Sequence, residues 1–213
     1  AIARRVAFLT DYQNAAYAAQ YTALVDKVKA TEQQKAPGST ALTEAVARYY
    51  FKLMAYKDEY EVARLHTSPE FRRQIESTFE GKFSLHFHLA PPLLARKDNQ
   101  GHLIKAEYGS WMYKAFGLLA KFRGLRGTAL DVFGYTAERK MERQLIVDYA
   151  HTIDQLLGKL DADNVSLAAE IAAIPEEIRG YGHVKEEHLA KAKKKEAELL
   201  AAFQRGEPSK AAA

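Results

Sequence analysis

Two histidines spaced two residues apart are the most specific candidate for chemistry in the sequence. His86 and His88 alternate with apolar residues in the segment 83–89, and a period of two is typical of a half-buried β-strand. On such a strand both imidazoles lie on one face, as two ligands of one metal ion would, and His102 on a return strand would be the third ligand. The polar face of a strand explains the pattern more simply, because a bare pair lacks the ligands of a stable metal site. Metal or ligand binding here is therefore our alternative hypothesis.

A second candidate is a charged stretch within the second long helix that we expect. Its cations would form a surface facing a partner domain or an anionic ligand, and they are Lys52, Lys57 and Arg64. Interleaved acidic residues favour a simpler interpretation, a solvated helix face with internal ion pairs. Asp58 and Glu59 are adjacent, so they diverge by about 100° around a helix. They do not form a paired-carboxylate site for acid–base catalysis.

Other catalytic signatures are missing from the sequence. The chain has no cysteine, which excludes disulfides, thiolate-ligated iron–sulfur clusters and a cysteine nucleophile. It has no nucleophile elbow and no dinucleotide fingerprint. Gly124 and Gly127 follow a helix, so they indicate helix termination and not a phosphate-binding loop. We predict no catalytic and no cofactor-binding residue, and we do not expect this chain to be an enzyme by itself.

Composition and charge are those of an ordinary globular protein. The 213 residues carry a formal net charge of +4, and the basic residues are mixed with acidic ones. The one lysine cluster, at 191–195, has no aromatic residues between the lysines and is followed by Glu196 and Glu198. We therefore expect no nucleic-acid partner. There is no signal-peptide pattern and no apolar run near the roughly 18 residues of a membrane span, so we predict a cytoplasmic protein without a membrane partner.

Apolar residues at alternating steps of three and four predict long helices that would position these groups. One stripe runs from Ile2 to Val28, ends at Pro37-Gly38 and predicts a single first helix. A second stripe runs from Leu42 to Ala63 and predicts a single second helix. The two helices would pair as an antiparallel hairpin. Ser68-Pro69 would begin a short helix.

The rest of the chain predicts one β-hairpin and further helices. Strands expected at 83–89 and 102–108 flank a polar turn at 97–101, and the helices are expected at about 111–122, 136–160, 167–178 and 184–203. A glycine-punctuated loop covers 123–135. We predict a mainly α fold, a single helical domain over 1–213 with antiparallel long helices. It would carry one small β-hairpin subdomain at about 82–108 and a frayed tail at about 206–213.

Five stretches of the sequence resemble one known family. The chain also begins with Ala1, inside a helical stripe, which we interpret as the start of a segment from a longer polypeptide. The five stretches are FLTDYQNAAYAAQY at 8–21, ALTEAVARYYFKLMAYKDEYEVARL at 41–65, FHLAPPLLAR at 87–96, FRGLRGTALDVFGYTAERKMERQLI at 122–146 and IRGYGH at 178–183. They are similar to the C-terminal region of the fused indolepyruvate ferredoxin oxidoreductases, members of the 2-oxoacid:ferredoxin oxidoreductase family.

The resemblance implies a parent enzyme that decarboxylates an aryl 2-oxoacid on thiamine diphosphate. The acyl group would pass to coenzyme A, and the electrons would leave through iron–sulfur clusters to ferredoxin. The motifs for these cofactors belong to other parts of such enzymes, so no catalytic residue is carried over to this chain. The resemblance therefore predicts an accessory domain whose partners are the other domains of the parent oxidoreductase.

Overall fold

The computed structural model describes residues 1–81, 84–89, 96–97, 103–104 and 106–207 and is mainly α-helical, as predicted. Where the sequence led us to expect one domain, the chain divides into two compact units. The bundle unit comprises Ala1–Tyr56 and Lys140–Ala213, and the hairpin unit comprises Lys57–Arg139. Among the described residues, no helix has the length and hydropathy needed to cross a membrane.

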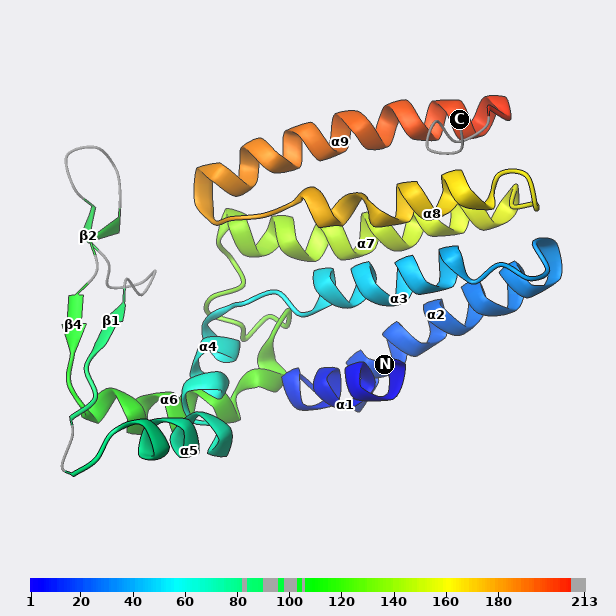
Figure 1. The fold of residues 1–213 in the computed structure, drawn as a ribbon. Coiled ribbons are helices and arrows are strands. Elements are labelled where there is room, and N and C mark those ends of the chain that lie inside the picture. Colours follow the sequence, from blue (N-terminus) through cyan, green and yellow to red (C-terminus); the bar gives the residue numbers. More distant parts are fainter. Residues whose placement is uncertain (82–83, 90–95, 98–102, 105, 208–213) are drawn as a thin grey trace. The chain divides into compact units, whose positions relative to one another are not determined.

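The bundle unit begins with two helices where the sequence pattern predicted one, so that prediction was wrong. Helix α1 spans Ile2–Tyr12 and α2 spans Ala15–Lys35 (Figure 1). The break lies at Asn14, whose backbone is extended and whose side chain accepts a 2.8 Å hydrogen bond from the Tyr17 amide. Asparagine in this N-cap position satisfies a free amide of the new helix. The apolar stripe continues across the break, which is why periodicity alone did not reveal it.

Helix α3 spans Ala41–Met54 and forms the predicted antiparallel hairpin with α2 (Figure 1). The turn contains Pro37-Gly38, with Gly38 at a φ of 91°. Glu32 of α2 is 1% exposed and accepts hydrogen bonds from the amides of Leu42 and Thr43, at 2.9 and 2.8 Å. Its carboxylate therefore caps the first turn of α3 from the neighbouring helix.

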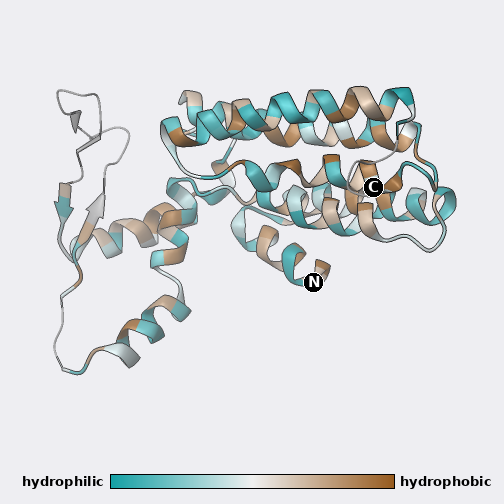
Figure 2. Ribbon diagram, turned by 45° about the horizontal axis from the view of Figure 1, so that its top comes forward, coloured by the Kyte–Doolittle hydropathy of each residue, from teal (hydrophilic) through white to brown (hydrophobic). Residues whose placement is uncertain are grey.

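The rest of the bundle unit consists of helices that run back and forth (Figure 1). They are α7 (Ala137–Gly158), α8 (Val165–Ala173), the 3-10 helix η2 (Ile174–Glu177) and α9 (Gly182–Arg205). Helix α8 packs on α3, and α9 packs on α8. Tyr149 of α7 stacks on Tyr50 of α3 with ring centroids 5.8 Å apart and donates a 2.8 Å hydrogen bond to the Ala172 carbonyl. Apolar and polar residues alternate along the helices (Figure 2), as amphipathic helices around one core require.

The hairpin unit contains three short α-helices, α4 (Glu59–His66), α5 (Pro69–Thr78) and α6 (Trp111–Lys121), and the 3-10 helix η1 (Arg123–Leu125). The single helix expected from Leu42 to Ala63 was wrong, because α3 ends at Met54 and α4 begins after Asp58. Asp58 caps α4 by accepting a 2.9 Å hydrogen bond from the Glu61 amide. Ser68 caps α5 as predicted, with its hydroxyl 3.2 Å from the Phe71 amide.

The predicted β-hairpin is present but shorter than expected. Strand β1 (Phe87–Leu89) pairs antiparallel with β4 (Ala106–Tyr108), and β2 (Arg96–Lys97) pairs antiparallel with β3 (Leu103–Ile104). Ser84 to His86 precede the first strand, while Phe83 and most of the predicted turn, 98–101, lie outside the described residues. Phe87 packs with Met112 and Phe116 of α6. This apolar contact supplies what a two-stranded hairpin lacks alone.

Candidate functional site

The structure describes contacts for one of the three predicted metal ligands. The Nδ1 atom of His86 lies 2.5 Å from a carboxylate oxygen of Glu107, and its Nε2 atom lies 3.1 Å from the Ser84 hydroxyl. The side chain of His88 and all of His102 lie outside the described residues. Among the residues that are described, no three histidine, aspartate or glutamate side chains are grouped as metal ligands would be. The His86 contacts fit a polar strand face, and metal binding there stays a prediction.

The three cations of the predicted interaction surface are found in different surroundings. Lys52 lies on α3 in the bundle unit, where its ammonium donates to the carbonyls of Pro175, Glu176 and Ile178 at 2.6, 3.2 and 3.1 Å. Burial, together with the nearby charge of Arg179, lowers the pKa of Lys52. In the hairpin unit, Arg64 forms two hydrogen bonds with Glu61, at 2.8 and 2.9 Å. Lys57 is exposed at the start of that unit. The sequence placed these residues on one helix, and the interruption after Met54 separates them.

The hairpin unit contains a buried ion pair between Asp58 and Arg126. The carboxylate of Asp58 accepts hydrogen bonds from Nε and Nη2 of Arg126 at 2.5 and 2.8 Å. The two residues are only 3% and 4% exposed. A buried pair of this kind is stable when both groups are hydrogen-bonded, and loss of one partner leaves a costly buried charge. Asp58 therefore both caps α4 and neutralises Arg126.

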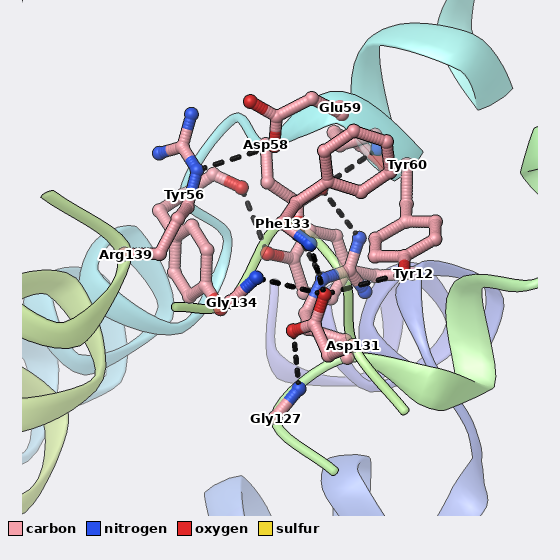
Figure 3. A network of polar contacts seen from close by, with 12 residues as sticks. Tyr12, Tyr56, Asp58, Glu59, Tyr60, Gly127, Asp131, Phe133, Gly134 and Arg139 are labelled. Carbon is pink, nitrogen blue, oxygen red and sulfur yellow. Dashed lines mark hydrogen bonds and ion pairs between the residues drawn. The ribbon is translucent and has the colours of Figure 1, made fainter. Parts of the chain in front are cut away.

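Asp131 organises the loop that carries Arg126 (Figure 3). Its carboxylate accepts hydrogen bonds from the amides of Gly127, Phe133 and Gly134 at 2.8, 3.2 and 3.0 Å. The hydroxyl of Tyr60 donates to the same carboxylate at 3.2 Å. Burial, together with the negative charge of Asp131, raises the pKa of Tyr60. Tyr60 also packs edge-on against the Phe133 ring, with centroids 5.3 Å apart.

The hydrogen bonds of this network give it a structural role. The described hydrogen bonds of the Asp58 and Asp131 carboxylates join α4 to loop amides and to neighbouring side chains. Such bonds fix the loop 123–135 on α4 and leave the groups directed at the protein itself. One sequence signal for the network existed, because Asp58 followed three residues later by Glu61 has the spacing of a capping box. Nothing in the sequence indicated that Arg126 and Asp131 would be buried.

Exposed apolar side chains are the second distinctive feature of the hairpin unit. Helix α6 buries Met112 and Phe116, whereas Trp111, Leu118 and Phe122 are 60, 59 and 48% exposed. The spacings of seven and four residues place the last three on one side of the helix. We call Trp111, Leu118 and Phe122 the α6 stripe.

The loop after α6 adds further exposed apolar residues, which are Leu130, Val132 and Tyr135. Asp131 holds the backbone of this loop, so these side chains are displayed by a fixed segment. Single exposed apolar residues are common on protein surfaces, but several on one rigid element are typical of an interaction site. The α6 stripe is therefore a candidate docking surface, to which the loop adds further exposed apolar side chains, and the sequence analysis did not identify it.

Comparison with known proteins yields one family and no characterised relative. No curated protein and no solved structure matches the chain significantly. Residues 1–198 match a family of unknown function designated DUF6537. The matched segment covers both α3 and α6 and therefore residues of both units. The chain belongs to the family of unknown function DUF6537.

Proposed function

We propose that this chain is a non-catalytic accessory domain of a longer enzyme of the indolepyruvate ferredoxin oxidoreductase type. Its role is assembly, by docking of the hairpin unit on another domain of that enzyme. The exposed α6 stripe is the single observation that carries the docking role. The five stretches of similar sequence support the identity of the parent enzyme.

The chemistry of the side chains supports a role without catalysis. The most deeply buried charged groups, such as Glu32, Asp58 and Asp131, hold helix starts and a loop in place. A residue poised for acid–base work needs a free path to a substrate. These three carboxylates instead accept hydrogen bonds from backbone amides.

The iron–sulfur clusters implied for the parent enzyme do not fit the residues of this chain. Iron–sulfur clusters are held mainly by cysteine thiolates, and the chain has no cysteine. The clusters would therefore be bound by other domains of the parent, which would also meet ferredoxin, and the resemblance implies that the motif for thiamine diphosphate belongs to those domains. This chain contributes contacts to that assembly and no step of the reaction.

The size and kind of the exposed side chains suit a docking interface. Tryptophan is enriched among the residues that contribute most to binding at protein interfaces. Each large apolar side chain that becomes fully buried contributes about 1.5–3 kcal/mol. Three such residues on one side of α6 provide an apolar patch of the type found in interfaces.

The proposal is tested in the longer enzyme with a double variant, Trp111→Ser with Leu118→Ser. We expect incomplete assembly, seen by analytical ultracentrifugation, together with reduced turnover of an aryl 2-oxoacid. Val147→Ser is the matched control, because Val147 is 62% exposed but lies on α7 in the bundle unit. This control should assemble and turn over like the unaltered enzyme.

Two results would contradict the proposal. One is unchanged assembly and turnover of the double variant. The other is decarboxylation of indolepyruvate by the isolated 213-residue chain after addition of thiamine diphosphate, because a domain without catalytic residues cannot carry out that step.

A further inference from the structure

The bundle unit contains a cavity of about 930 Å³ whose lining includes five cations. Helix α1 contributes Arg4 and Arg5, α3 contributes Arg48 and Lys52, and the segment after η2 contributes Arg179. Glu176 is its single acidic lining residue. Five cations and one carboxylate give the lining a formal charge of 5 − 1 = +4.

Hydrogen bonds between α3 and the segment at η2 hold this cavity together. Lys52 donates to the carbonyls of Pro175, Glu176 and Ile178. The hydroxyl of Tyr49 donates to the Glu176 carboxylate at 2.6 Å, which lowers the pKa of Glu176. Arg179 donates from Nε to the Glu176 carbonyl at 2.9 Å. These contacts fix the position of Arg179 relative to the cations on α3.

Three of the arginines in the cavity form no ion pair with a carboxylate among the residues that the structure describes. Within the described part of the chain, Arg4, Arg5 and Arg48 form no ion pair, although Arg5 lies over the Phe51 ring at 5.8 Å and Arg48 over the Tyr49 ring at 5.4 Å. Other cations of the same unit do form ion pairs, such as Lys27 with Asp154 and Lys195 with Glu177. Glu176 offsets only part of the positive charge of the cavity, and the remaining like charges repel each other, so an anion would stabilise the arrangement.

We infer that this cavity binds a small molecule that carries two or more phosphate groups. Guanidinium groups match phosphate oxygens with pairs of parallel hydrogen bonds, and several of them around one cavity fit a multiply charged anion. The volume lies within the roughly 300–1,000 Å³ of small-molecule sites. Phe8 and Phe51 line the same cavity and provide an apolar wall for the organic part of such a ligand.

The inference is independent of the docking role, because it uses other residues in the other unit. The experiment is isothermal titration of the full 213-residue chain with inorganic pyrophosphate and with ADP at low ionic strength. We expect saturable binding of one molecule per chain that weakens steeply with added salt. Vesicles containing phosphatidic acid form a parallel arm, which distinguishes a soluble phosphate compound from a lipid headgroup.

Two exposed arginines of the cavity provide the decisive variants. Arg4→Gln and Arg48→Gln should each weaken pyrophosphate binding by about tenfold or more, the loss expected for one charge-assisted hydrogen bond. Arg48→Lys should recover part of that loss, since it restores the charge but not the planar pair of donors. Lys194→Gln is the matched control, because it removes one exposed positive charge of α9 outside the cavity. All variants should retain the thermal unfolding temperature of the unaltered chain.

The results that would overturn the inference are equally specific. If neither pyrophosphate nor ADP binds at millimolar concentration, the inference is overturned. Binding of the vesicles alone would overturn it too. Equal weakening by Lys194→Gln and Arg48→Gln would also overturn it, because that result indicates general attraction to a basic surface.

Discussion

The carboxylate of Glu32 caps the start of α3, and its removal measures how much this cap stabilises the bundle unit. Its two carboxylate oxygens accept hydrogen bonds from the Leu42 and Thr43 amides and from the Ser39 and Thr43 hydroxyls. Glu32→Leu would leave two amides at a buried helix start without acceptors. Each unsatisfied amide lowers the free energy of unfolding by about 1–3 kcal/mol. The leucine recovers part of this by burial, so we expect a loss of roughly 2–4 kcal/mol in the free energy of unfolding.

The assay is urea-induced unfolding followed by circular dichroism, with Glu44→Leu as the control. Glu44 is exposed and accepts a 2.9 Å hydrogen bond from the Thr40 hydroxyl in the same helix start. The control should change the free energy by less than about 0.5 kcal/mol. A loss below about 1 kcal/mol for Glu32→Leu would refute the reasoning, because it would mean that the buried amides do not depend on this carboxylate.

The same contacts predict a pH dependence. Burial opposes the ionisation of Glu32, but the hydrogen bonds from Thr43, Ser39 and Leu42 outweigh it and lower its pKa below the ordinary value of 4.5. A lowered pKa in the folded state means that the stabilisation is present above pH 4.5 and is lost as the pH falls below that value. The stability difference between the unaltered chain and Glu32→Leu should therefore shrink below pH 4.5.

Two further substitutions test the hairpin unit and the start of α9. Asp58→Asn should lower the free energy of unfolding by about 3 kcal/mol, because it removes a charged partner of the buried Arg126. Glu76→Gln in the exposed Arg72–Glu76 pair should cost less than about 0.5 kcal/mol. Equal effects in urea unfolding would contradict the buried-pair argument. Gly180→Ala should cost more than about 1 kcal/mol, since Gly180 has a φ of +88° and a Cβ there would lie 2.8 Å from Val184 Cγ1. Gly158→Ala is the control, because a Cβ there meets open space, and it should not destabilise the chain. A melting temperature unchanged by Gly180→Ala would contradict the backbone and steric strain expected at this position.

Periodicity and turn residues predicted most helices, and local capping explains the errors. The apolar stripe persisted through Asn14 and Asp58, so the two long helices were each predicted without their interruption. At both positions a short polar side chain accepts a hydrogen bond from the amide three residues later. A search for N-cap residues inside a continuous stripe would have found both breaks.

The candidate surfaces were less predictable, because they depend on long-range contacts. Lys52 was identified as a candidate contact to an anion or a partner, but its neighbours in the cavity, Arg4 and Arg179, are 48 and 127 residues away along the sequence. Only folding brings these segments together. The exposure of Trp111 could not be predicted either, because α6 is apolar on both sides and periodicity does not indicate which side is buried. The buried charges Glu32 and Arg126 are likewise set by tertiary contacts.

Direct association between this chain and the remainder of the longer enzyme that we propose is the measurement that bears most closely on the docking role. The two parts would be produced separately, and their affinity measured by surface plasmon resonance for the unaltered chain, for Trp111→Ser with Leu118→Ser, and for Val147→Ser. Docking through the α6 stripe predicts tight binding of the unaltered chain and of Val147→Ser, and weakening by about 30-fold or more in the double variant. Equal affinity of all three chains, or no association at all, would contradict it.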